Sequence, residues 1–176
     1  MRNTANTPKR RGFTLVEVLI VVVILGILAA TVLPQFSNAS DDARESALVQ
    51  DLQAWRSQLE LYKFQHHGKY PGFGGTSSDV RDGILKASKA DHTTAAVGTV
   101  GYPFGPYFAG SIPPNPFTGS KGIILTTDVA AYVPDETATD ATSSEVAGWI
   151  YNPVTGRVKA NCEGFAADGV TKLADL

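Results

Sequence analysis

The sequence predicts an α+β fold in which one long N-terminal helix packs against a small C-terminal antiparallel β-sheet. Three observations support this prediction. Residues 13–33 form an unbroken apolar run, helical periodicity resumes after Pro34 and continues to about Gln65, and the β-prone segments lie in the last third of the chain. A helical region followed by a group of strands is typical of this fold class.

The apolar run has the length of a membrane-spanning helix. At about 1.5 Å of rise per residue it would extend roughly 31 Å, close to the hydrocarbon thickness of a bilayer. The residues before it carry four positive charges and no acid, at Arg2, Lys9, Arg10 and Arg11. The positive-inside rule therefore predicts a cytoplasmic N-terminus and a C-terminal part beyond the membrane. An ordinary secretory signal peptide is not expected, since its apolar core is only about 7–15 residues long.

Glu17 is the only ionisable side chain in this run. A carboxylate inside a bilayer costs at least about 2.5–3.5 kcal/mol on insertion scales unless it is neutralised or paired. A positively charged partner is therefore expected. The alternative is a plain signal anchor, in which Glu17 lies near the helix end by chance.

The junction of leader and helix reads Lys-Arg-Arg-Gly at residues 9–12 and Phe-Thr-Leu-Val-Glu at residues 13–17. It resembles the type IV pilin superfamily, which includes the pseudopilins of type II secretion. The resemblance implies that a membrane aspartic peptidase cleaves between Gly12 and Phe13 and methylates the new N-terminus. It also implies assembly into a filament, in which the Phe13 ammonium pairs with Glu17 of a neighbouring subunit.

Further along the chain, Leu-Glu-Leu-Tyr-Lys at residues 59–63 and Ile-Pro-Pro-Asn-Pro-Phe at residues 112–117 are similar to the major pseudopilin. The sequence departs from that family at Asn115 and Phe117, where an acidic residue and a tryptophan are usual. The single Cys162 cannot form the intramolecular disulfide that closes a C-terminal loop in many type IV pilins. A pseudopilus subunit is therefore preferred over a subunit of a surface pilus for adhesion, motility or DNA uptake. A membrane-anchored binding module that does not polymerise is a further alternative.

The expected domain organisation has three parts. A basic leader occupies residues 1–12, a transmembrane and filament-core helix residues 13–34, and a globular domain residues 35–176. Loss of the leader would change the formal net charge from −2 to −6. Such a surface gives no support to nucleic-acid binding, for which a basic patch is expected.

Within the globular domain, the helix continues with an apolar stripe that includes Trp55, Leu59 and Tyr62, which we interpret as core. Pro34 should kink or locally melt the helix, and Gly68 should end it. The neighbouring His66 and His67 are interpreted as structural, because adjacent side chains point in different directions and no third ligand follows at the spacing of zinc sites.

The segments after the long helix predict one short helix and a small sheet. The helix is expected at residues 79–89, and β-prone segments occupy residues 122–127 and 129–133. A hairpin should join residues 148–151 to residues 157–160 through the turn Asn-Pro-Val-Thr-Gly. The tail should pack along the sheet edge, with Cys162 as a small buried residue.

The loop at residues 135–145 is acidic and rich in Ser and Thr. Major pseudopilins as a family hold calcium in C-terminal loops, and on that resemblance the ligand candidates are Asp135, Asp140, Glu145 and Asp168. Calcium is thus the one cofactor suggested. Because no EF-hand spacing is present, a solvated loop is the preferred interpretation.

No catalytic motif is found. The sequence contains no Gly-x-Ser-x-Gly, no phosphate-binding loop and no His-Glu-x-x-His. We therefore expect a homo-oligomeric filament subunit and not an enzyme. The resemblance implies a bacterial inner-membrane location before assembly into a periplasmic or extracellular filament. Its implied partners are the prepilin peptidase, a cytoplasmic assembly ATPase and a membrane platform protein.

Overall fold

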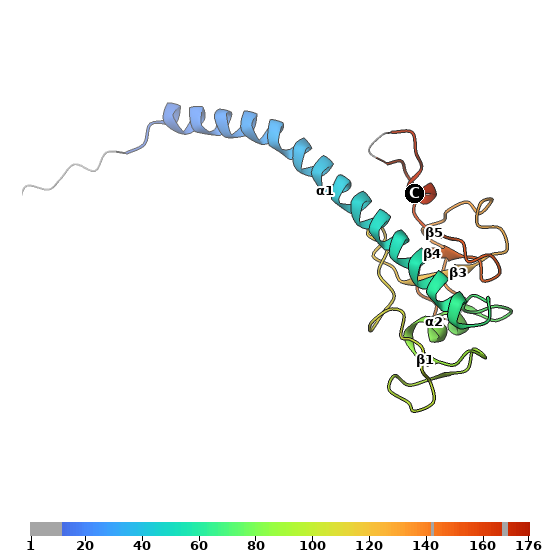
Figure 1. The fold of residues 1–176 in the computed structure, drawn as a ribbon. Coiled ribbons are helices and arrows are strands. Elements are labelled where there is room, and N and C mark those ends of the chain that lie inside the picture. The colour runs from blue at the N-terminus through green and yellow to red at the C-terminus, as the bar shows by residue number, and fades with distance from the viewer. Residues whose placement is uncertain (1–11, 142, 167–168) are drawn as a thin grey trace, which may run out of the picture. The chain divides into compact units, whose positions relative to one another are not determined.

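A computed structural model of the chain describes residues 12–141, 143–166 and 169–176. Figure 1 shows the order of its elements. They are α1 (Leu15–Gln65), α2 (Ser77–Leu85), β1 (Ala87–Ser88), β2 (Thr94–Ala95), β3 (Gly122–Leu125), β4 (Ala147–Tyr151), β5 (Val158–Ala160) and the 3-10 helix η1 (Leu173–Asp175). The chain divides into two compact units, Met1–Ser40 and Asp41–Leu176, and α1 contributes to both. The basic residues of the predicted leader lie outside the described residues.

In the first unit, α1 presents mainly apolar side chains along the segment Leu15–Val32, in which Glu17 is the one ionisable residue. This is the one segment of the described residues that is long and apolar enough to cross a membrane. Leu19, Val22 and Ile24, for example, are each more than half exposed. Apolar surface of this extent is unfavourable in water. Of the two effects expected at Pro34, local melting does not occur, because the helix runs through this residue.

In the second unit, the C-terminal part of α1 supplies one wall of the hydrophobic core. Leu48, Leu52, Trp55, Leu59 and Tyr62 are all almost completely buried and recur at steps of three and four residues. The Trp55 ring lies 5.9 Å from the Trp149 ring of β4, measured between centroids. The predicted packing of this stripe against the C-terminal sheet is therefore confirmed.

The sheet of the second unit has the strand order β3-β4-β5. β4 and β5 pair antiparallel, with Trp149 opposite Ala160 and Tyr151 opposite Val158, so the predicted hairpin is confirmed. β3 and β4 pair in parallel, so the expectation of a wholly antiparallel sheet was wrong. The long segment between these strands is the reason, because it is long enough for the crossover connection that a parallel pair requires.

The predicted β-prone segment at residues 129–133 does not form a strand. The Asp128 side chain accepts hydrogen bonds from the N–H groups of Ala130 and Ala131, both at 3.1 Å. Such a local turn competes with strand pairing for the same backbone donors. Local side-chain chemistry therefore overrides β-propensity here.

The remaining elements differ from expectation mainly in their limits. α2 begins and ends earlier than the predicted helix, since a capping box between Thr76 and Asp79 fixes its start. In the tail, η1 contacts β5 and Lys159 lies 3.8 Å from Asp175, as the predicted packing along the sheet edge requires. Cys162 is buried, and burial raises the pKa of its thiol to about 11. This cysteine is therefore an unreactive core residue.

The buried side chains of Asn115, Asn152 and Asn161 form hydrogen bonds with the backbone of the loops in the second unit. Each side-chain amide donates to a backbone carbonyl, and each side-chain oxygen accepts from at least one backbone N–H. The donor bonds run from Asn115 to Gly148, from Asn152 to Thr127, and from Asn161 to Asp135 and Ala147, at 2.7–2.8 Å. A carboxylate at position 115 could not donate the bond to Gly148, which gives a structural reason for an asparagine at this position.

At the end of α1, His66 is buried and stacked on Tyr62, with ring centroids 3.7 Å apart. Its Nδ1 lies 2.8 Å from the Tyr62 carbonyl oxygen and its Nε2 3.0 Å from Ser88 Oγ. His92 Nδ1 lies 3.0 Å from the Tyr62 hydroxyl. His67 is exposed, which confirms that the adjacent histidines point in different directions. Burial lowers the pKa of both His66 and His92.

From the lowered pKa of His66 and His92 we expect the second unit to lose stability in mild acid. A lowered pKa means that these histidines bind protons more readily in the unfolded chain than in the folded chain. Their contribution to the free energy of unfolding is therefore fully present above about pH 6.5 and is lost as the pH falls below it. Thermal unfolding of the full chain in detergent between pH 8 and pH 5 should show a falling Tm. His66→Gln should flatten this dependence. His67→Asn, which suits the positive φ at that position, should leave it unchanged. An equal slope in the wild type and His66→Gln would contradict the assignment.

Candidate functional site: the α1 N-terminus and the Arg81 network

The N-terminus of α1 is closed by a reciprocal capping box between Thr14 and Glu17. The Thr14 N–H donates to Glu17 Oε2 at 2.9 Å, and the Thr14 hydroxyl donates to the same oxygen at 2.8 Å. The Glu17 N–H in turn donates to Thr14 Oγ1 at 3.1 Å. Two backbone donors that a helix start leaves unpaired are thereby satisfied. The Thr-x-x-Glu spacing at residues 14–17 is a signal in the sequence for this cap, which was not among the sequence-based predictions.

The cap holds the Glu17 carboxylate within one turn of the start of α1. A negative charge at this end interacts favourably with the helix dipole. An ionised carboxylate offers about four lone-pair sites, so a capping carboxylate retains the capacity to bind a further cation. The pairing of Glu17 with an ammonium of a neighbouring subunit stays a prediction.

Gly12 and Phe13 precede the helix in non-helical backbone. Phe13 is 87% exposed, and no atom would lie within 4 Å of a Cβ added at Gly12. The bond between them is thus accessible and outside regular structure. This is the geometry expected of a processing site, whose use stays a prediction.

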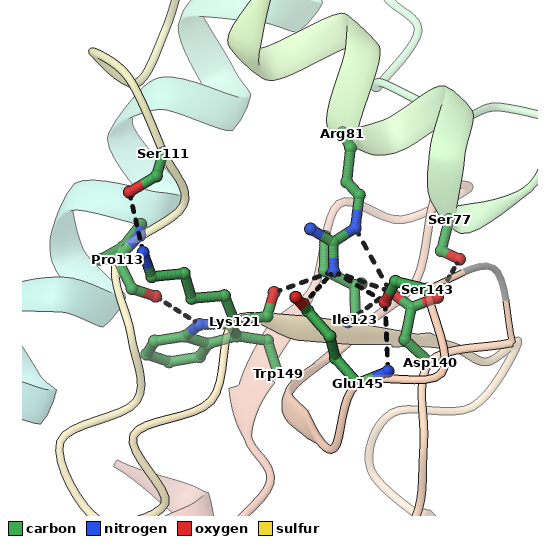
Figure 2. A network of polar contacts seen from close by, with 10 residues as sticks. All are labelled: Ser77, Arg81, Ser111, Pro113, Lys121, Ile123, Asp140, Ser143, Glu145 and Trp149. Carbon is green, nitrogen blue, oxygen red and sulfur yellow. Dashed lines mark hydrogen bonds and ion pairs between the residues drawn. The ribbon is translucent and has the colours of Figure 1, made fainter.

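A second polar site lies in the globular unit and centres on Asp140 and Arg81 (Figure 2). Asp140 is fully buried and accepts hydrogen bonds from the hydroxyl of Ser77, at 2.6 Å, and from the N–H of Ile123, at 3.0 Å. Arg81 of α2 donates to the same carboxylate through Nε at 3.3 Å and Nη2 at 3.0 Å. The carboxylate thus connects α2, β3 and the acidic loop.

Arg81 Nη2 lies among several oxygen atoms. In addition to Asp140, it lies 3.3 Å from Ser143 Oγ, 3.3 Å from Glu145 Oε2 and 3.4 Å from the carbonyl oxygen of Lys121. We call this set of residues the Arg81 network: Ser77, Arg81, Lys121, Ile123, Asp140, Ser143 and Glu145. Arg81 was not among the site residues predicted from sequence. No local pattern points to it, since 59 residues separate it from Asp140.

The calcium candidates occupy different environments. Asp140 is buried, so the interpretation of residues 135–145 as a solvated loop was wrong for this residue. Asp135 accepts from the N–H and hydroxyl of Thr137, at 2.8 and 2.6 Å, and Glu145 pairs with Arg81. Asp168 lies outside the described residues. In the part of the chain that the structure describes, no group of three or more His, Cys, Asp or Glu residues is placed to hold a metal ion.

Comparisons with known proteins agree with the N-terminal geometry. The family described as prokaryotic N-terminal methylation motif matches residues 7–33. Type II secretion system core protein G of Escherichia coli K12 is 40% identical over 65 residues, which cover 37% of this chain and 44% of that protein. Its counterpart in Pseudomonas aeruginosa is 43% identical over 63 residues, 36% of this chain and 44% of that protein. The chain thus spans less than half the length of these relatives.

A longer match extends into the globular unit. The type IV major fimbrial protein FimA of Dichelobacter nodosus is 33% identical over 131 residues, which cover 64% of this chain and 82% of that protein. No solved structure matches the chain. The methylation motif, the capped apolar helix and the extended similarity to a fimbrial subunit together show that the chain belongs to the superfamily of type IV pilins and type II secretion pseudopilins.

Proposed function

We propose that this chain is the repeating structural subunit of a helical type IV pilus-like filament, the pseudopilus of a type II protein secretion system. The observation that carries the proposal is the apolar, exposed segment Leu15–Val32, whose start is capped by Glu17 and preceded by an accessible Gly12–Phe13 bond. A role in catalysis is not part of it. The similarity to core protein G supports the type II secretion branch.

In this proposal the subunit is first inserted in the bacterial inner membrane. The leader charges favour an N-terminus in the cytoplasm and a globular unit on the far side. The proposed boundaries are a leader at residues 1–12, a membrane and filament-core helix at residues 13–34 and a globular domain at residues 35–176. Prepilin peptidase would remove the leader, and an assembly ATPase and a platform protein would drive extraction from the membrane.

Assembly exchanges lipid contacts for contacts between helices. Lipid tails are as apolar as the side chains, so the exchange gains little from the hydrophobic effect and depends on packing and polar pairing. Glu17 provides the polar pairing in this proposal. Cleavage creates an ammonium on Phe13, and the capped carboxylate of a neighbouring subunit supplies its counter-charge. Each new subunit would thus be matched in register to the one before it.

A surface type IV pilus is the second candidate, because the match to the fimbrial protein covers more of both chains. Deletion of the gene separates the two. If the chain is a pseudopilus subunit, the deletion should block the release of secreted proteins and leave surface filaments unaffected. Loss of surface filaments with normal secretion would favour the pilus. Secretion assays and electron microscopy of the same deletion strain decide between them.

One prediction of the proposed function concerns processing. Gly12→Val should leave the precursor uncut, because the branched side chain would stand directly at the scissile bond. Mass spectrometry of wild-type protein extracted from membranes should find Phe13, in methylated form, at the N-terminus. An intact Met1 N-terminus in the assembled form would contradict the assignment.

Another prediction separates the charge of Glu17 from its capping role. Glu17→Gln can keep the capping bonds without the charge, whereas Glu17→Leu removes both. An unpaired buried charge costs about 3–5 kcal/mol, and a third of that is about tenfold in an equilibrium constant. Sheared filaments counted by electron microscopy should therefore fall at least about tenfold in both variants.

Membrane insertion and cleavage serve as the controls for this comparison. Both should persist in the two variants, because removal of a carboxylate eases insertion and the scissile bond precedes Phe13. Immunoblots of membrane fractions report both steps. Wild-type filament numbers with Glu17→Gln, but not with Glu17→Leu, would show that the cap and not the charge matters.

A further inference from the structure

The resemblance to major pseudopilins implies a calcium site in the C-terminal loop. Whether the residues present fit a calcium ion can be judged from the geometry of the Arg81 network. A calcium ion takes six to eight oxygen ligands at about 2.3–2.6 Å, with lone pairs directed at the ion. In Asp140, Oδ1 accepts from Ser77 and Oδ2 accepts from Arg81 and the Ile123 N–H. Both carboxylate oxygens therefore face donors, and the guanidinium lies where the ion would have to stand. The residues do not fit calcium while Arg81 is in place.

The surroundings of Arg81 Nη2 show what occupies that position instead. Its four oxygen neighbours come from two carboxylates, one hydroxyl and one backbone carbonyl, at 3.0–3.4 Å. These are the oxygen types that a hard cation prefers, at the longer distances of N–H···O bonds. A single cationic nitrogen thus stands at the point where the oxygens of the acidic loop converge.

The buried charge of Asp140 requires such a partner. A fully buried carboxylate is strongly disfavoured unless it is paired and hydrogen-bonded. The Arg81 side chain is only 22% exposed, so water screens this pair little. The rigid guanidinium fork meets Asp140 through two nitrogens while it also reaches Glu145. Lys121 does not share this role, because its ammonium turns away to Ser111 at 3.3 Å (Figure 2).

We propose that the Arg81 guanidinium is the built-in cation of the acidic loop and takes the place of a bound calcium ion. The globular unit then folds without metal. The oxygen atoms around Nη2 form a latent cation site that becomes available when the guanidinium is removed. This proposal concerns the single subunit and does not depend on filament assembly, so its failure and the failure of the proposed function are separate results.

The test is thermal unfolding of the full chain in detergent, followed by circular dichroism in EDTA and in millimolar CaCl2. The wild-type Tm should be the same in both. In EDTA, Arg81→Ala should unfold about 10 °C lower, because the buried Asp140 carboxylate loses its counter-charge. CaCl2 should raise the Tm of this variant, because the ion can then reach the freed oxygens.

Two further variants sharpen the comparison. Lys86→Ala removes a cation from an exposed pair with Asp82 next to the same helix, and its Tm should stay near the wild-type value in both solutions. Arg81→Lys keeps a cation in the site without the fork, so its Tm should lie between those of the wild type and Arg81→Ala and should not respond to CaCl2.

Three results would overturn the proposal. They are a wild-type Tm that falls in EDTA and rises in CaCl2, an Arg81→Ala Tm equal to that of the wild type in EDTA, and an Arg81→Ala Tm that ignores CaCl2. If Arg81→Ala does not fold in EDTA, recovery of the folded signal on addition of CaCl2 supports the proposal and continued absence of that signal overturns it.

Discussion

The contact between Trp55 of α1 and Trp149 of β4 is the interaction on which the globular unit depends. It joins the helix to the central strand of the sheet, and Trp149 also donates from Nε1 to the Pro113 carbonyl at 2.9 Å. Among the described residues Trp55 Nε1 has no hydrogen-bond partner, which costs about 1–3 kcal/mol. Burial of an indole ring contributes about 4–6 kcal/mol at 25 cal/mol per Å². Apolar burial therefore outweighs the orphaned donor, and the ring stays in the core.

The same helix meets a different requirement in each unit. In the globular unit a single stripe is apolar and finds its partner within the chain, whereas along Leu15–Val32 all faces are apolar and their side chains are exposed. The second segment is complete only in lipid or against other protein. The capped carboxylate of Glu17 at its start is the one ionisable group in this segment.

How much of this could be predicted from sequence depends on the range of the interaction. Helix periodicity and turn chemistry are local, and they predicted α1, its buried stripe around Trp55 and the β4–β5 hairpin. The parallel pairing of β3 and β4 depends on how a long connection returns, and strand propensity carries no information on that. The turn at Asp128 could have been predicted from this residue type, but the β-prone residues after it favoured the prediction of a strand. The partner of Asp140 lies on α2, far away in the sequence. The composition of the loop therefore indicated that Asp140 is solvated, whereas in the fold it pairs with Arg81.

The loops of the globular unit are held by side-chain hydrogen bonds instead of a covalent link. Cys162 is a single buried thiol, and the loop at residues 135–147 is tied by Asn161 at its ends and by Arg81 near its middle. Each asparagine bond contributes only about 1 kcal/mol net, but removal of one leaves several buried backbone groups unpaired. Stability of this kind is cooperative and needs no oxidant. If Arg81 also takes the place of a calcium ion, the globular unit reaches its fold with groups supplied entirely by its own chain.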